Sequence, residues 1–267
     1  MMNVKRIYII LTVCISLLFC ACSKDDLFDF VVGPQPHFLD DHQFIAGLNI
    51  LGVIRPDSFD GKSLSTIQIE KVVPAVSKID DSTTVIDYNF VIYKIINQTI
   101  IDSLCFVYKY PDTTYIHQPT DFNPFPGNHY RIVCQSPGLP ILTAETVIPN
   151  QPVIVNGSMN IKQNNIQFAI NNDTSAFLYD IYIFVGDQQY NKRLIRSKIG
   201  NTIVDISGNI PQKTAINLSI YAYDKHLSEY LTVTNLFIKP NTFRPPFSTV
   251  HNGYGCFGSL NVLTLNF

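Results

Sequence analysis

The sequence lacks tryptophan, and only 15% of its 267 residues are charged. A chain without tryptophan lacks the large flat ring on which sugar-binding proteins often stack a pyranose. Lysine and arginine together number 19 against 21 acidic residues, and no basic cluster stands out. Nucleic acid and anionic lipid surfaces are therefore poor candidate partners.

Motifs of the common enzyme classes are missing as well. The chain has no G-x-S-x-G, no H-E-x-x-H, no Walker phosphate loop and no dinucleotide-binding fingerprint. The densest polar cluster is HFLDDH at residues 37–42, which could bind a divalent cation, but it precedes the first expected strand. Nothing there fixes ligand geometry, so we predict no metal, no cofactor and no catalytic residue. A hydrolase site assembled from distant residues is the open alternative.

The first apolar run is too short to be a retained membrane span. It extends from Ile7 to Phe19 behind Lys5 and Arg6, whereas a spanning helix needs roughly 20 residues. A positive charge followed by a short apolar run is the layout of a secretory signal. We predict that residues 1–21 form a signal peptide that is removed.

Two cysteines stand at the end of this signal. Ala21 precedes Cys22, whereas the bulky Phe19 precedes Cys20, and signal peptidases require a small residue before the cut. The stretch Phe19–Cys22 therefore resembles a lipobox, in which the cysteine is acylated. The multiple acylation that this resemblance implies gives a stable membrane anchor. The alternative is an ordinary cleaved signal with Cys22 as a spare thiol.

Residues 22–40 are predicted to be a lipidated acidic tether. Ser23, Lys24, Asp25 and Asp26 follow the anchor cysteine. This run is similar to the export signal that sends Bacteroidota lipoproteins to the cell surface, and the alternative is a solvated spacer. We expect an outer-membrane protein that faces the cell exterior and contacts lipid through acylated Cys22.

The cysteines beyond the anchor leave two interpretations open. Cys105 and Cys134 lie in strand-like runs, and an oxidising compartment would allow them to form a disulfide if their strands are neighbours. Alternatively, these two and Cys256 are three small buried apolar residues. No C-x-x-C or Cys/His spacing indicates a metal or redox site.

From residue 41 onward, short apolar runs with two-residue alternation are separated by Asn, Asp, Gly and Pro. They predict strands at 44–54, 65–72, 83–96, 103–110, 128–135, 142–149, 153–159, 165–171, 176–186, 192–199, 202–206 and 215–223. One short helix is expected within 225–237. This pattern is typical of an all-β protein with antiparallel sandwiches of the immunoglobulin or fibronectin type. We predict two sandwiches, residues 41–150 and 151–267.

Short Asp-Ser/Thr triplets are associated with O-glycosylation in Bacteroidota. Ser82 and Thr113 stand in such triplets within loop-like stretches, and Ser103 stands in a third triplet. Triplets of this kind also arise by chance. Ser82 and Thr113 are the candidates that we retain.

Two longer stretches carry a family resemblance. They are FPGNHYRIVCQSPGLPILTAETVIPNQP (125–152) and PPFSTVHNGYGCFGSLNVLTLNF (245–267). Both resemble passages of a Bacteroidota lipoprotein family, the domain of unknown function numbered forty-two forty-nine. The resemblance implies an outer-membrane lipoprotein with immunoglobulin-like or fibronectin-like architecture, often encoded beside TonB-dependent receptors. It supplies no catalytic residues.

These motifs also have a physical interpretation. Gly127 follows Pro126, and a type II turn there needs a positive φ at the glycine. Gly253, Gly255 and Gly258 suit a bulge or a close approach of backbones at the start of the last strand. Cys256 takes the place of an apolar residue in the family pattern, so we expect it in the core.

Two functional hypotheses follow. The first is a non-enzymatic surface lipoprotein that assists a TonB-dependent transporter, by capturing a ligand or by docking against the barrel. The second is a structural or adhesive surface protein such as a pilus-associated anchor, which would show a strand-donating tail or a long unpaired edge. The terminal NVLTLNF (261–267) is strand-like, and we expect it to be the last strand of its own sandwich.

Overall fold

The computed structural model describes most of the chain from residue 45 onward. The described residues are 45–73, 87–108, 116–117, 122–198, 200–208, 215–233 and 250–267. Side chains are described for all of them except 106–108, 116–117 and 233. The signal peptide, the tether and the 37–42 cluster lie outside these ranges.

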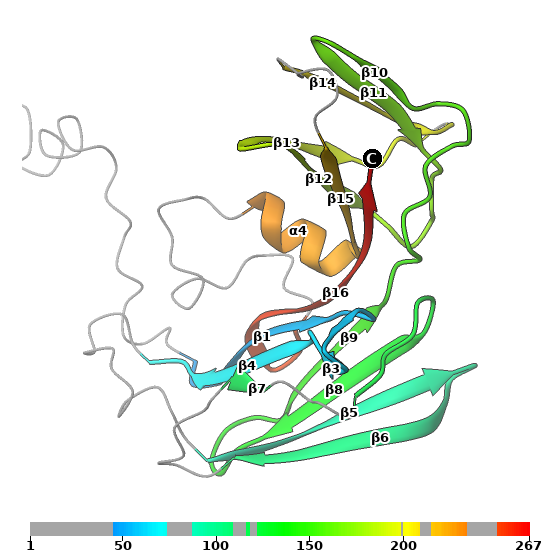
Figure 1. Ribbon diagram of the computed structural model, residues 1–267. Coiled ribbons are helices and arrows are strands. Elements are labelled where there is room, and N and C mark those ends of the chain that lie inside the picture. Colours follow the sequence, from blue (N-terminus) through cyan, green and yellow to red (C-terminus); the bar gives the residue numbers. More distant parts are fainter. Residues whose placement is uncertain are drawn as a thin grey trace, which may run out of the picture. The chain divides into compact units, whose positions relative to one another are not determined.

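The described residues are mostly strands, with one short helix (Figure 1). The strands of the first half are β1 (Leu48–Ile54), β2 (Ser58–Phe59), β3 (Lys62–Ser63), β4 (Thr66–Lys71), β5 (Tyr88–Ile96), β6 (Thr99–Tyr108), β7 (Ile116–His117), β8 (His129–Gln135) and β9 (Leu142–Val147). Those of the second half are β10 (Asn160–Lys162), β11 (Asn165–Ile170), β12 (Leu178–Val185), β13 (Gln188–Ile195), β14 (Thr202–Ser207), β15 (Ile216–Tyr223) and β16 (Gly253–Asn266). The helix α4 spans Lys225–Val233.

The first sandwich packs β1, β4 and β7 against the four-stranded sheet β6-β5-β8-β9. Alternation within each strand turns its apolar residues inward. In β8, for example, Tyr130, Ile132 and Cys134 are buried while His129 and Arg131 are half-buried. The shared core joins both sheets and includes residues of β1, β4, β5, β8 and β9.

The second sandwich repeats this arrangement. Its three-stranded sheet is β10-β11-β14, and the facing strands run in the order β13-β12-β15-β16. When the two-residue strands β2 and β3 are left out, both sandwiches place the first, second and fifth strands in chain order in one sheet and the other four in the second sheet. This is the strand order of a fibronectin type III domain, so the predicted all-β sandwich class is confirmed.

The long last strand belongs to both sandwiches. Gly253–Ser259 pairs in parallel with β1, and residues 260–266 pair antiparallel with β15. As a result one seven-stranded sheet, β13-β12-β15-β16-β1-β4-β7, runs through both halves (Figure 1). The ranges assigned from the sequence place residues 253–267 in the second sandwich alone, and the parallel pairing with β1 adds the first half of β16 to the N-terminal sheet. The terminal residues pair within their own chain, as expected.

A third, smaller cluster of apolar residues lies where β16 passes between the sandwiches. Leu227 of α4 packs with Cys256 and Leu260 of β16, and Val53 of β1 joins the cluster from the first sandwich. Cys256 is 2% exposed, which confirms that this cysteine lies in the core. The helix therefore covers the place where β16 changes partners.

The loops carry the turn chemistry that the sequence indicates. Gly127 has a φ of +75°, as expected. Asn97 and Gln98, also at positive φ, form the two-residue turn between β5 and β6. The predicted strand at 153–159 is reduced to an isolated bridge between Ile154 and Ile170. Pro152 stands directly before this run and Gly157 lies within it, and both residues favour turns.

Candidate functional site

Most residues to which the sequence assigns a role lie outside the described residues. They are the lipidation site Cys22, the export run Ser23, Lys24, Asp25 and Asp26, and the glycosylation candidates Ser82 and Thr113. Their roles stay predictions. In the part of the chain that the structure describes, no helix is both long and apolar enough to cross a membrane.

The structure has no disulfide between Cys105 and Cys134, which is one of the two interpretations that the sequence left open. The two cysteines lie on β6 and β8, and β5 runs between these strands. Cys105 is exposed beside Val91, whereas Cys134 is buried beside Phe90, so their side chains leave opposite faces of the sheet. A disulfide needs Cβ atoms about 4 Å apart, and both thiols are free. Burial raises the pKa of Cys134 to about 12, as expected for a thiol in an apolar core.

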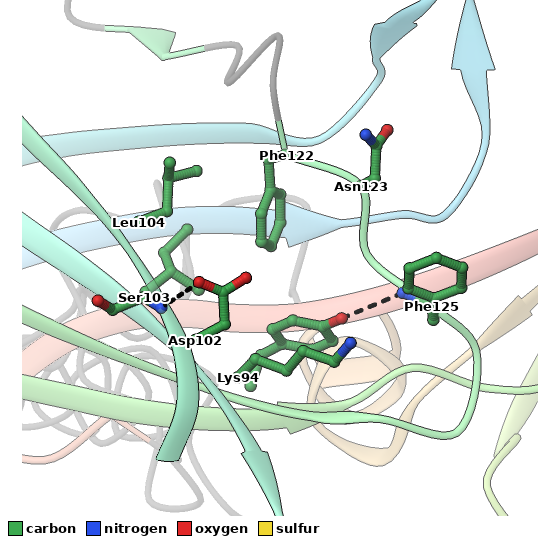
Figure 2. A pocket seen from close by; sticks show the side chains of 9 residues that line it. Lys94, Asp102, Ser103, Leu104, Phe122, Asn123 and Phe125 are labelled. Atoms are coloured by element: carbon green, nitrogen blue, oxygen red, sulfur yellow. Dashed lines mark hydrogen bonds between the residues drawn. The ribbon is translucent and has the colours of Figure 1, made fainter.

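A pocket of about 440 Å³ opens at one edge of the first sandwich (Figure 2). One wall is the inner face of β5, β6 and β8, and the other is the loop of residues 122–125. Ile92, Leu104 and Phe122 supply apolar surface, while Lys94 and Asp102 supply charges. The volume lies within the roughly 300–1,000 Å³ of small-ligand sites, and such a mixed lining is typical of them.

The charged side chains of Lys94 and Asp102 face the pocket because they lie on the same face of the sheet as core residues. Along β5, Lys94 continues the inward series Tyr88, Phe90 and Ile92, and a register shift directly after Lys94 ends this series. Asp102 stands opposite Lys94 on β6. The sheet therefore places a cation and an anion side by side on a face that is otherwise apolar.

The loop of residues 122–125 is held against the sheet by an aromatic contact and a hydrogen bond. The Phe122 and Tyr130 rings meet edge to face with centroids 5.6 Å apart. The Phe125 N–H donates to the Tyr130 hydroxyl oxygen over 3.1 Å (Figure 2). The Gly127 N–H donates to the Ile148 carbonyl over 2.8 Å, which fixes the loop's far end. Both walls are thus built before any ligand arrives.

A buried polar network joins the sandwiches at a second place. Thr146 of β9 donates its hydroxyl to Asp224 Oδ2 over 2.7 Å and lies 2.7 Å from the Ser259 hydroxyl of β16. Asp224 Oδ1 accepts the Leu227 N–H over 2.9 Å and so caps α4. Burial raises the pKa of Asp224, although these hydrogen bonds oppose the shift. The carboxylate is a structural link between β9, β16 and the helix.

A pocket of about 430 Å³ lies beside this network and carries two histidines. His129 Nε2 is 2.9 Å from Glu145 Oε2, and Arg131 binds the other oxygen of Glu145. Partial burial raises the pKa of Glu145, but Arg131 and His129 outweigh this effect and lower it. His226 Nδ1 lies 2.7 Å from the Glu145 carbonyl oxygen. Both histidines therefore contact Glu145. The contact with His226 links α4 to the first sandwich.

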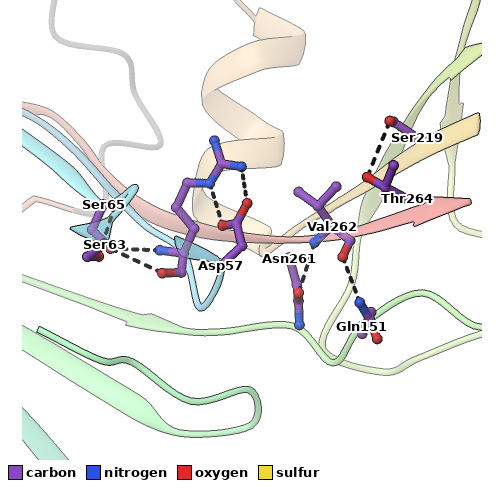
Figure 3. A network of polar contacts seen from close by, with 9 residues as sticks. Asp57, Ser63, Ser65, Gln151, Ser219, Asn261, Val262 and Thr264 are labelled. Carbon is purple, nitrogen blue, oxygen red and sulfur yellow. Dashed lines mark hydrogen bonds and ion pairs between the residues drawn. The ribbon is translucent and has the colours of Figure 1, made fainter. Parts of the chain in front are cut away.

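The linker between the sandwiches is hydrogen-bonded to β16. Asn261 is 3% exposed, and its side-chain amide donates to the Pro149 carbonyl over 3.0 Å. The Gln151 amide donates to the Val262 carbonyl over 2.9 Å (Figure 3). These bonds restrict movement of the linker against the shared strand.

The pocket residues were missed by reasoning from sequence. A usable signal existed at Lys94, because a lysine in phase with three core residues faces inward. Across the described ranges no cluster of three or more His, Cys, Asp or Glu side chains could hold a metal ion.

Comparison with known proteins gives no relative. No family model and no curated protein matches the chain. Among solved structures, the two-domain fibronectin type-III segment of chicken tenascin is 12% identical with a TM-score of 0.27, covering 82% of this chain and 96% of that chain. Domains FN1–FN3 of chicken CNTN1 are 12% identical with a TM-score of 0.26, covering 81% and 67%. The chicken interferon gamma receptor alpha chain is 8% identical with a TM-score of 0.24, covering 67% and 90%. These scores are too low for any functional argument.

Proposed function

We propose that this chain is a non-enzymatic, lipid-anchored outer-membrane protein that faces the cell exterior. In this proposal it captures a small ligand for a TonB-dependent transporter or docks against that transporter. The protein belongs to the lipoprotein family that residues 125–152 and 245–267 resemble, and Cys22 carries the lipid. The lipobox and the acidic run after it support this location.

The observation that carries ligand capture is the pocket between β5, β6, β8 and the 122–125 loop. Its walls are fixed by hydrogen bonds within the sandwich, so binding needs little ordering of the protein. The shared strand β16 gives the two sandwiches a common sheet. A preformed pocket in a sandwich that shares a sheet with its neighbour suits the capture of a ligand and its transfer to a transporter.

Uptake in cells tests this proposal. Deleting the gene is expected to lower uptake of the substrate of an adjacent TonB-dependent transporter, in a strain where that transporter is active. Wild-type protein and the Cys20→Ser variant restore uptake, whereas Cys22→Ser does not because its anchor is lost. Unchanged uptake after deletion, or full rescue by Cys22→Ser, contradicts the proposal.

An adhesive or structural role is the second candidate, and the edge strand β6 favours it. β6 is ten residues long and ends its sheet, and among the described strands only β5 pairs with it. Ile100 and Ile101 on this strand are 52% and 51% exposed. Such an edge is a template for strand addition.

Self-association distinguishes this candidate. If β6 recruits another copy, light scattering detects oligomers at high protein concentration, and Ile100→Lys reduces them while Ile195→Lys on the exposed end of β13 does not. A protein that stays monomeric over a hundredfold concentration range rules out self-assembly through β6.

A further inference from the structure

We propose that the pocket beside Lys94 and Asp102 binds a small zwitterion, namely a free amino acid or a short peptide with an apolar side chain. The ligand's ammonium lies against Asp102, and its carboxylate lies against Lys94. This inference rests on the proposed function as a capture protein, because it names the class of molecule captured.

The first observation is that the two charges are neighbours without being paired. Lys94 and Asp102 are directly opposite each other on β5 and β6. Opposite charges in such positions normally attract, but these two side chains form no ion pair within 4 Å. Both side chains line the pocket, and Figure 2 shows that their charged ends lie apart from each other.

The second observation is that each charge is held in position by a different contact. Lys94 Nζ lies over the Phe125 ring, 5.0 Å from its centroid. Asp102 Oδ1 accepts the Ser103 N–H over 2.8 Å, and Oδ2 accepts no hydrogen bond from any described residue. The ammonium and the carboxylate therefore keep hydrogen-bonding capacity directed at the cavity. A zwitterion offers both complementary partners.

The third observation concerns the surface between the charges. Ile92 and Leu104 face the cavity from the sheet, and Phe122 faces it from the loop. Ile92 and Phe122 belong to the first core, and Leu104 packs against it. An apolar side chain of the ligand would be shielded from water there, while the ligand's charged ends pair with Lys94 and Asp102. Small-ligand sites usually combine an apolar lining with a few polar groups in this way.

The same features disfavour ligands with other charge patterns. A simple anion would pair with Lys94 but meet Asp102, and a simple cation would meet Lys94. A neutral sugar would leave both charges without a countercharge, and the ammonium of Lys94 already occupies one face of the Phe125 ring. Specificity arises from the unfavourable pairs as well as the favourable ones.

Calorimetry on the full chain in detergent micelles tests the proposal, with leucine and leucyl-leucine as probes. At least one probe is expected to bind. Lys94→Met and Asp102→Asn are each expected to weaken binding about tenfold or more, because each removes a charge-assisted hydrogen bond. The matched controls Lys162→Met and Asp187→Asn remove exposed charges outside the pocket lining and leave affinity unchanged.

A capped ligand makes the assignment specific. N-acetyl-leucyl-leucine lacks the ammonium and is expected to bind more weakly than leucyl-leucine. Asp102→Asn is expected to bind this capped ligand as wild type does, whereas Lys94→Met is expected to bind it more weakly than wild type does. This comparison isolates each pair as a double-mutant cycle does. Melting temperatures of the variants, measured in parallel, identify any that fail to fold, and the exchanged pair Lys94→Asp with Asp102→Lys then replaces the single variants.

Three outcomes overturn the inference: neither probe binds, a probe binds with an affinity that no pocket variant changes, or maltose binds with the same dependence on Lys94 and Asp102. None of these bears on the uptake experiment, which reports transporter assistance whatever the ligand. Conversely, unchanged uptake after gene deletion combined with pocket-dependent binding of leucyl-leucine removes the transporter role and leaves the binding site.

Discussion

Gly255 shows how closely two backbones approach at the start of β16. Its φ is +90°, and it stands opposite Ile50 in the parallel pair with β1. A Cβ at this position would overlap the Ile50 carbonyl oxygen and would lie 2.6 Å from Asn49 Oδ1. Glycine is therefore required here by its neighbour as well as by its own conformation.

Gly255→Ala is expected to lower the free energy of unfolding by about 3 kcal/mol or more, because backbone atoms must move to admit the methyl group. The control is Gly138→Ala, since Gly138 has a φ of +74° and no atom within 4 Å of the added Cβ. It retains only backbone strain, about 1 kcal/mol. Urea denaturation compares them, and equal losses would contradict the close approach.

Asp224 makes stability depend on pH. Burial raises its pKa in the folded protein, so its charged form is disfavoured there relative to the unfolded chain. Its contribution to stability is therefore greatest below its ordinary pKa of about 3.9 and is lost as the pH rises through the folded value. Asp224→Asn keeps an oxygen for the Leu227 N–H but does not ionise.

We expect the free energy of unfolding of Asp224→Asn, relative to wild type, to increase as the pH is raised from 4 to 7. Glu145 and Asp173 have lowered pKa values and produce the opposite trend in both proteins, so their effect cancels in the difference. Urea denaturation at several pH values measures this difference. A difference that does not change with pH means that Asp224 is not the titrating group.

Between elements, the Thr146 hydroxyl links β9 with the start of α4 and with β16. Thr146→Val keeps the shape of the side chain but leaves Asp224 and Ser259 without this partner. The expected loss is about 1–3 kcal/mol in the free energy of unfolding. Thr143→Val is the control, because Thr143 lies on the half-buried face of the same strand. Chemical denaturation that finds equal losses would show that the network contributes nothing.

A strand could be predicted from the sequence where apolar and polar residues alternate along it. β8 and β9 alternate between buried and accessible residues along their whole length, and both were predicted to within two residues. β2, β3 and β7 have two residues each, too few to show a period. The first half of β16 shows no alternation, because Gly255 to Asn261 are buried in succession.

For the whole molecule, the shared strand predicts that both sandwiches unfold together. Phe257 lies in the first core and Leu218 in the second, and β16 pairs with strands of both sandwiches. Phe257→Ala and Leu218→Ala are each expected to cost about 2–5 kcal/mol and to shift one common transition. Calorimetry with hydrogen exchange measures this. Two separate transitions, or loss of protection confined to the mutated half, would show independent domains.

The candidate pocket could be predicted only in part. Lys94 and Asp102 lie eight residues apart in a hairpin, but the Asn97–Gln98 turn with regular pairing would place Ile101 opposite Lys94. The register shift between Lys94 and Ile95 brings Asp102 opposite Lys94 instead. The opposite wall is formed by Phe122 and Phe125, whose position depends on Tyr130 and on the turn at Gly127. No periodicity in the sequence specifies that contact.

Local pattern was sufficient for the all-β class, for most strands and for the turn at Gly127, because period and turn chemistry act between residues close in the chain. The pairing of Gly253–Ser259 with β1, the separation of Cys105 from Cys134 and the burial of Asp224 were decided by tertiary structure. Each depends on which surfaces meet across many residues, and that choice is made by the packing of the whole core rather than by any segment alone.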